Sequence, residues 1–308
     1  MRRSPSSILA LTALLAIPAA CGTGHAAAEG KVVGDRISVV ATTTQLADFA
    51  RAVGGDHADV HGLLRANVDP HDFEPSPADV ARLASAAVIV KNGLGLEHWF
   101  DATIRNAEPK GTIVEAATGV AVRHGGAGRE GEADPHIWHD PRNARVMVHS
   151  IALALTAADP SHRADYEANE AAYDGALDRL DQEIAAQIGG LANKQLVTNH
   201  DAFGYYVARY GLDFVGSIIP SFDSQAELSA ADIAGVVKRI RATGVKAVFS
   251  ETSLPPKTAE AIGREAGVAV VAGDDALYGD SLGPPGSDGD TYLKMERHNT
   301  REIVDHLR

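Results

Sequence analysis

The sequence predicts an α/β protein of two similar lobes with parallel sheets, joined by one long rigid helix. Short β-branched runs alternate with helix-like segments from about residue 36, and the alternation resumes after residue 189. Between the two series lies a charged, alanine-rich stretch, 161–188, without proline. Strands that alternate with helices form parallel sheets with right-handed crossovers. A helix of about 26 residues spans roughly 39 Å, which is longer than one lobe needs for its own crossover.

The first lobe is expected over residues 36–160. Ser76 and Pro77 are typical of a helix N-cap and of a first helical position, and Asp79 follows in the first turn. The expected elements, in order, are a strand at Ile37–Thr42, a helix at Gln45–Val53, a strand at Ala58–Leu64, a helix at Ser76–Ala84, a strand at Ala86–Asn92, a helix at Glu97–Asn106, a strand at Thr112–Glu115 and a helix at Pro141–Ala158.

The linking helix is expected over 161–188 and the second lobe over 189–308. The same strand and helix patterns return there, although no internal sequence repeat is evident. The expected elements are a strand at Gln195–Thr198, a helix at Ala202–Tyr210, a strand at Asp213–Ser217, a helix at Ala230–Thr243, a strand at Lys246–Ser250, a helix at Pro256–Ala266, a strand at Val268–Val271 and a helix near Asp290–Leu307.

The chain begins with the pattern of a secretion signal peptide, predicted over residues 1–20. Arg2 and Arg3 precede an apolar segment, Ile8–Ile17, which is too short to cross a bilayer, and small residues follow at a cleavage site. Cys21, the single cysteine, comes next, in a "PAAC" run that resembles the lipobox of bacterial lipoproteins; a free thiol is the alternative. We therefore expect an exported protein, in the periplasm or lipid-anchored on the cell surface, with a flexible tether over 21–35.

The charge of the chain disfavours polyanionic partners. Its 41 acidic residues exceed the 28 basic ones, giving a formal net charge of −13, and loss of Arg2 and Arg3 with the signal makes it more negative. Nucleic acid is therefore not an expected partner. A cationic ligand suits the sign of the charge.

Two short motifs match catalytic or nucleotide-binding patterns without the structural context that these need. Gly126, Gly128 and Gly131 satisfy G-x-G-x-x-G but lie in a polar loop rather than between a strand and a helix. Ser281 satisfies G-x-S-x-G, yet prolines follow at once and the preceding strand ends near Val271. We expect neither a dinucleotide site nor a serine hydrolase.

Three of the 13 histidines lie where expected strands end or where proline and acidic neighbours fix the backbone. His71 lies in "DPHDFEPSP", His136 in "DPHIWHDP" and His200 in "VTNHDAFG", while an acidic stretch, Asp274–Asp280, follows the last strand. The carboxyl ends of parallel strands border the ligand crevice in open sheets. Imidazoles and a carboxylate that converge there favour a divalent metal, best Zn²⁺. No H-E-x-x-H helix is present.

Nearly the whole mature chain resembles the metal-binding receptors of bacterial ABC importers, the zinc and manganese solute-binding proteins called cluster A-I. The matching regions are "VDPHDFEPSPADVARLASAAVIVKNGLGLEHW", "DPHIWHDP", "VTNHDAFGYYVARYGL" and "LYGDSLG", in the family's order. The resemblance implies two α/β lobes on one long helix and a metal ion buried between them. It also implies an importer permease as partner, and a metallochaperone is a further possible one.

The resemblance implies His71, His136, His200 and Asp280 as the metal ligands. Manganese-type members carry a carboxylate at the third position and zinc-type members a histidine, so His200 favours zinc. The sequence departs from the pattern at His139, where leucine is usual; its imidazole is either a transient ligand or a neighbour that points away. Glu251 follows an expected strand, and we expect it behind the ligands or bridging the lobes.

The function expected is a monomeric extracytoplasmic receptor that captures Zn²⁺ and delivers it to a permease, without catalysis. Four protein ligands leave no open position for an activated water. The alternatives are a zinc-dependent hydrolase with three histidine ligands and Asp280 or Glu251 as general base, and a manganese-type receptor or an adhesin on the same fold.

Overall fold

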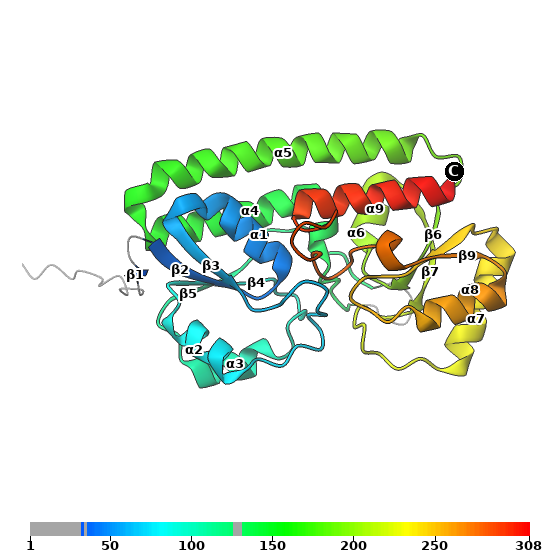
Figure 1. Cartoon of the computed structure of the whole chain (residues 1–308), viewed down its shortest axis with the longest axis horizontal. Coiled ribbons are helices and arrows are strands. Elements are labelled where there is room, and N and C mark those ends of the chain that lie inside the picture. Colours follow the sequence, from blue (N-terminus) through cyan, green and yellow to red (C-terminus); the bar gives the residue numbers. More distant parts are fainter. Residues whose placement is uncertain (1–31, 34–35, 126–130) are drawn as a thin grey trace, which may run out of the picture.

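A computed structural model describes residues 32–33, 36–125 and 131–308 (Figure 1). The predicted signal peptide 1–20, Cys21 and the predicted tether, apart from Val32 and Val33, lie outside these residues, as do Gly126 and Gly128. Among the described helices, none is both long and apolar enough to cross a membrane.

The first lobe contains a parallel sheet in the order β3-β2-β4-β5. Its strands are β2 (Arg36–Ala41), β3 (Ala58–Gly62), β4 (Val88–Lys91) and β5 (Thr112–Glu115), and β1 (Val32–Val33) pairs antiparallel with β2. The helices are α1 (Thr44–Gly54), α2 (Pro77–Ser85), α3 (Phe100–Ala107) and α4 (Pro141–Ala158). The predicted cap of α2 is confirmed, because Ser76 and Asp79 each bond the other's backbone N–H.

The second lobe repeats the architecture, with a parallel sheet in the order β7-β6-β8-β9. Its strands are β6 (Gln195–His200), β7 (Asp213–Ile219), β8 (Ala247–Phe249) and β9 (Ala269–Val271). The helices are α6 (Gly204–Tyr210), α7 (Ala230–Thr243), α8 (Lys257–Ala266) and α9 (Tyr292–Leu307). Single 3₁₀ turns lie at η1 (Gly55–His57), η2 (Ile137–His139), η3 (Pro160–His162) and η4 (Gly273–Asp275).

Helix α5 (Arg163–Gly189) has 27 residues and runs along both lobes, as Figure 1 shows. Its buried residues recur at helical spacing on one side, and the remaining positions are largely charged or alanine. Contacts join it to α4, α1, α9 and α6, which come from both lobes. The predicted linking helix and the two-lobe α/β fold are therefore confirmed. The buried residues of α5 are Tyr166, Leu177, Leu180, Ile184 and Ile188.

The two faces of each sheet contribute to different hydrophobic cores, because strand side chains alternate between faces. Val39 and Leu196 belong to one large cluster that runs through both lobes beneath α5. Val40 belongs to a second cluster under α2 and α3, and Val197 to a third under α7 and α8. The shared cluster makes the lobes one packed body on the α5 side, and each keeps a separate core on its outer side.

Two element ends differ from the sequence prediction for identifiable reasons. The helix expected from Glu97 begins only at Phe100, because the buried Glu97 carboxylate instead accepts the backbone N–H groups of Asn92 and Gly93 and the Thr42 hydroxyl. Strand β6 continues beyond Thr198 to His200, which pairs with Ile219 of β7. His200 is thus anchored in the sheet instead of lying in the loop after it.

Truncation of α5 tests the shared core. Ile184→Ala should lower the free energy of unfolding by roughly 2 to 5 kcal/mol, because Ile184 is fully buried and its removal leaves a cavity. Urea denaturation followed by circular dichroism measures the change. Gln182→Ala, at an exposed position of the same helix, is the control and should change stability by less than about 0.5 kcal/mol. Equal effects of the two substitutions would contradict the conclusion that the buried face of α5 stabilises the fold.

Candidate metal centre

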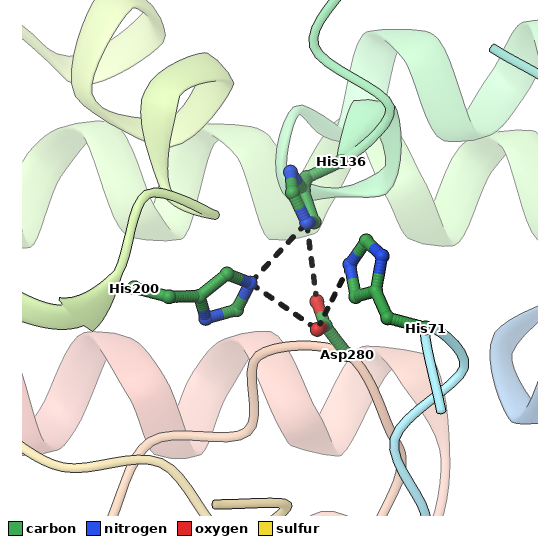
Figure 2. A group of neighbouring side chains, drawn as sticks. All are labelled: His71, His136, His200 and Asp280. Carbon is green, nitrogen blue, oxygen red and sulfur yellow. Dashed lines mark hydrogen bonds and ion pairs between the residues drawn. The ribbon is translucent and has the colours of Figure 1, made fainter. Parts of the chain in front are cut away.

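The four side chains implied by the sequence converge on one point, although they come from four separate segments (Figure 2). His71 lies in the loop between β3 and α2, and His136 lies directly before η2. His200 is the last residue of β6, and Asp280 lies between η4 and α9. Two of the four precede α5 in the chain and two follow it, so the group is assembled from both lobes.

The separations between these side chains are those of a small coordination shell. Nε2 of His136 and Nε2 of His200 are 3.3 Å apart. Asp280 oxygens lie 3.2 Å from His200 Nε2, 3.5 Å from His136 Nε2 and 3.6 Å from His71 Nε2. Tetrahedral ligands at about 2.0–2.1 Å from a metal ion are about 3.3 Å from one another. The four groups therefore surround a space of the size that one bound metal ion needs.

Two buried carboxylates fix the orientation of two of the imidazoles. Asp134 Oδ1 lies 2.9 Å from Nδ1 of His136, and Glu251 lies 2.9 Å from Nδ1 of His200. An ionised carboxylate only accepts hydrogen bonds, so each Nδ1 must carry the proton. In the neutral imidazoles, Nε2 is then unprotonated and both lone pairs point to the centre. This is the carboxylate–histidine arrangement that orients imidazoles toward a metal.

His71 is held differently. Neither of its ring nitrogens has a hydrogen-bond partner in the described part of the chain. Its backbone N–H instead donates to Asp69 Oδ1 at 2.8 Å, which closes a turn around Pro70. The carbonyl of Pro70 accepts a hydrogen bond from Trp99 Nε1 at 3.1 Å. The His71 imidazole is therefore positioned through its backbone.

Asp280 is positioned by the contacts of the two residues before it. The side chain of Asn299, in α9, bonds both the N–H and the carbonyl of Tyr278 at 2.8 Å. Trp138 Nε1 donates to the carbonyl of Gly279 at 3.1 Å. Gly279 itself must lack a side chain, because a Cβ there would collide with the carboxylate of Glu251. The segment before α9 is thus fixed against both the His136 loop and the carboxylate behind His200.

The electrostatics of the group favour a cation. Burial lowers the pKa of the His71 imidazole to about 4, despite the facing Asp280 carboxylate. Burial also opposes a charge on His200, but Glu251 and Asp280 outweigh it and hold the imidazole pKa well above its usual range. Burial disfavours ionisation of Asp280 too, yet His200, His136 and His71 hold its pKa well below the usual range. Asp280 is therefore a carboxylate at neutral pH, among nitrogens that attract positive charge.

The remaining sequence candidates lie outside this group. The His139 imidazole points away, toward Glu296 of α9, with Nδ1 2.9 Å from the carboxylate and the ring stacked on Phe203. Glu251 lies behind His200, as expected. Ser281 is buried, and its hydroxyl bonds the carbonyl of Leu282.

Sequence reasoning missed the positioning residues Asp134, Asp69 and Asn299. Asp69 and Asp134 could have been found from the sequence, because D-P-H occurs both at 69–71 and at 134–136. In each case the aspartate accepts the backbone N–H of the histidine. A second group of possible metal ligands, Asp275, Glu302 and His306, also lies together. There Asp275 is exposed and Glu302 already pairs with Arg301, so this group is the weaker candidate.

Two α/β lobes on one long helix, with three imidazoles and a carboxylate buried between them, define a metal-binding receptor. The chain belongs to the family described as zinc-uptake complex component A, periplasmic (ZnuA), whose model matches residues 39–306. The family consists of solute-binding proteins of transporters and not of enzymes. The expected location outside the cytoplasm is confirmed.

The relatives agree on the class of protein and differ in the metal they are named for. The iron ABC transporter substrate-binding lipoprotein MtsA of Streptococcus pyogenes serotype M1 is 30% identical over 282 residues, 89% of each chain. The manganese ABC transporter substrate-binding lipoprotein PsaA of Streptococcus pneumoniae is 30% identical over 312 residues, 98% of each chain. The periplasmic zinc binding protein TroA from Treponema pallidum is similar in structure, with a TM-score of 0.81 and 28% identity over 88% of this chain and 99% of that one. The chain is accordingly a metal-binding substrate-binding protein that works with an ABC permease.

The orienting carboxylates provide a test of the site geometry. Glu251→Gln should weaken metal binding by about 10- to 100-fold, because the amide donates as well as accepts and no longer fixes the His200 tautomer. Titration with a chelating dye as competitor measures the affinity. Asp181→Asn is the control, since Asp181 pairs with Arg209 and Tyr210 and takes no part in the group. If Glu251→Gln bound metal as tightly as Asp181→Asn, the carboxylate would have no orienting role.

Proposed function

We propose that the chain is a zinc receptor that binds Zn²⁺ through His71, His136, His200 and Asp280 and delivers it to its permease. The observation that carries this proposal is the convergence of two tautomer-fixed imidazoles, a third imidazole and a carboxylate. The Asp280 oxygens lie 3.2 to 3.6 Å from the three Nε2 atoms, and those of His136 and His200 are 3.3 Å apart. Four such ligands complete a tetrahedron, the geometry of closed zinc sites. Because no ligand position is left for water, we expect no catalysis by a zinc-bound hydroxide.

Zinc is preferred over manganese and iron because of the donor atoms. Imidazole suits Zn²⁺, whereas Mn²⁺ prefers carboxylate, carbonyl and water oxygen. Asp280 is the single carboxylate in the group. The family resemblance implies that His200 occupies the position at which manganese-type members carry an oxygen ligand. The names of MtsA and PsaA favour iron or manganese, and each of the two sequences is 30% identical to this chain. The ligand set therefore supports zinc more directly than the relatives do.

The expected partners follow from export and from the family. We propose that Cys21 becomes the lipidated first residue after removal of 1–20, which would hold the receptor at the membrane beside its permease. A metallochaperone that hands over zinc is a further candidate partner. We expect the receptor to act as a monomer, since the site is complete within one chain.

Removal of any one imidazole tests the ligand assignment. His71→Ala, His136→Ala and His200→Ala should each weaken Zn²⁺ binding by at least about 100-fold, because each removes one of four ligand bonds. Dye competition gives the affinity, and circular dichroism verifies that the apo fold survives. His149→Ala is the control, because His149 lies exposed on α4. Wild-type zinc affinity in any one of the three variants would remove that residue from the ligand set.

An exchange of donor type tests the choice of metal. His200→Asp should reduce the preference for Zn²⁺ over Mn²⁺ by at least about tenfold, because it replaces an imidazole by a harder oxygen ligand. Both affinities are measured by competition on the same preparation, and wild-type protein purified without added metal is analysed by mass spectrometry. His149→Asp is the matched control. Wild-type protein that carried manganese or iron and little zinc would replace the zinc proposal with that metal.

A further inference from the structure

The two D-P-H turns use their aspartates differently. In both turns, one oxygen of the aspartate accepts the histidine backbone N–H, at 2.8 Å for Asp69 and 3.1 Å for Asp134. Asp134 then bonds the ring of its own histidine, His136, at 2.9 Å. Asp69 makes no such bond to the His71 ring. Its second oxygen is therefore available for another partner.

That partner lies on the other lobe. Asp69 Oδ2 accepts a hydrogen bond from the Ser224 hydroxyl and another from Gln225 Nε2 at 3.2 Å. Ser224 and Gln225 belong to the segment between β7 and α7, 155 residues or more from Asp69 in the chain. Asp69 is 9% exposed and Ser224 5% exposed, so water competes little for these bonds.

The segment that carries Ser224 also borders the metal ligands. The Phe222 ring lies 6.1 Å from the His136 ring, and the Ser221 carbonyl accepts the N–H of Asp201, the residue after His200. The loop that carries His71 also borders a surface groove of about 520 Å³, which is lined by first-lobe residues that include Val68 and Phe73. The His71 loop thus has open space beside it, and the hydrogen bonds that Asp69 accepts from Ser224 and Gln225 hold the loop to the second lobe.

We infer that Asp69, Ser224 and Gln225 form a latch between the lobes that retains the metal by holding His71 in ligating position. Asp69 is a positioning residue, because it acts on the metal through the backbone of His71. Since the ring nitrogens of His71 have no orienting partner in the described residues, opening of the latch frees this ligand before the others. The inference rests on the proposed function in so far as His71 is a ligand.

Metal dissociation kinetics test the latch. Ser224→Ala should speed release of Zn²⁺ into excess chelator by about 10- to 100-fold, because it removes a hydrogen bond to a buried carboxylate, with little change in the association rate. Gln225→Ala, at an exposed position, should speed release by a smaller factor and is not expected to disturb folding. Ser217→Ala is the matched control: Ser217 is a buried serine of the same lobe whose hydroxyl bonds Ile219 and not Asp69.

A double substitution separates the latch from a general loss of stability. In an Asp69→Ala background, Ser224→Ala should cause no further acceleration, because the bond it removes is already absent. Independent, multiplying effects would overturn the latch, and so would equal release from Ser224→Ala and Ser217→Ala.

The same measurements are made with Mn²⁺, so that the latch and the choice of metal are judged separately. If wild-type protein bound Mn²⁺ and not Zn²⁺, and Ser224→Ala sped the release of Mn²⁺, the latch would be supported and the zinc proposal contradicted. Wild-type protein that held neither ion would overturn both.

Discussion

The structure depends on holding three imidazoles and one carboxylate in a buried space, with their possible ligand atoms all within 4.8 Å of one another. Nε2 of His136 and Nε2 of His200 lie 3.3 Å apart, and Asp280 adds a negative charge beside them. Such a group repels itself unless a cation lies between its members. Because the proposed ligands come from segments before and after α5, the two lobes must keep their relative position to within about 0.5 Å for all four to bind one ion. The hydrophobic cluster that both lobes share along α5 meets that requirement.

Helix α9 connects the shared hydrophobic core to the metal-binding group through hydrogen bonds. Its buried side is unusually polar: Asn299 holds the backbone beside Asp280, Glu296 pairs with His139, and the Tyr292 hydroxyl donates to the carbonyl of Trp138 at 2.6 Å. These bonds reach segments on both sides of α5. Each pairs a buried polar atom of α9 with an atom of another segment, and such buried bonds help to specify one arrangement. A helix that contacts both lobes in this way favours small tilts of the lobes over wide opening.

The parts of this structure that sequence could predict are those encoded by local patterns. Runs of β-branched residues mark β2, β4 and β6, the Ser76–Asp79 cap marks the start of α2, and the proline-free stretch marks α5. The ligand residues emerged from strand ends and from a family resemblance. The orienting partners could not be predicted in the same way, because the bonds from Glu251 to His200 and from Asn299 to Tyr278 depend on how distant elements pack. The residues around Glu97 favour a helix, but its side chain accepts hydrogen bonds from the backbone of Asn92 and Gly93, and the helix begins after it.

The charges around the site also bear on which ion it accepts. Asp134 is compensated by Arg123, whose guanidinium lies 2.8 Å away. Among the described residues, Glu251 and Asp280 have only imidazoles as ion-pair partners. With neutral imidazoles, these two carboxylates leave about two negative charges to be balanced, which a divalent cation does and a proton shared between rings does only in part. The charge alone does not distinguish Zn²⁺ from Mn²⁺ or Fe²⁺. Selectivity must then come from the donor atoms and their geometry, and the three imidazole nitrogens of the group are the feature on which the zinc proposal rests.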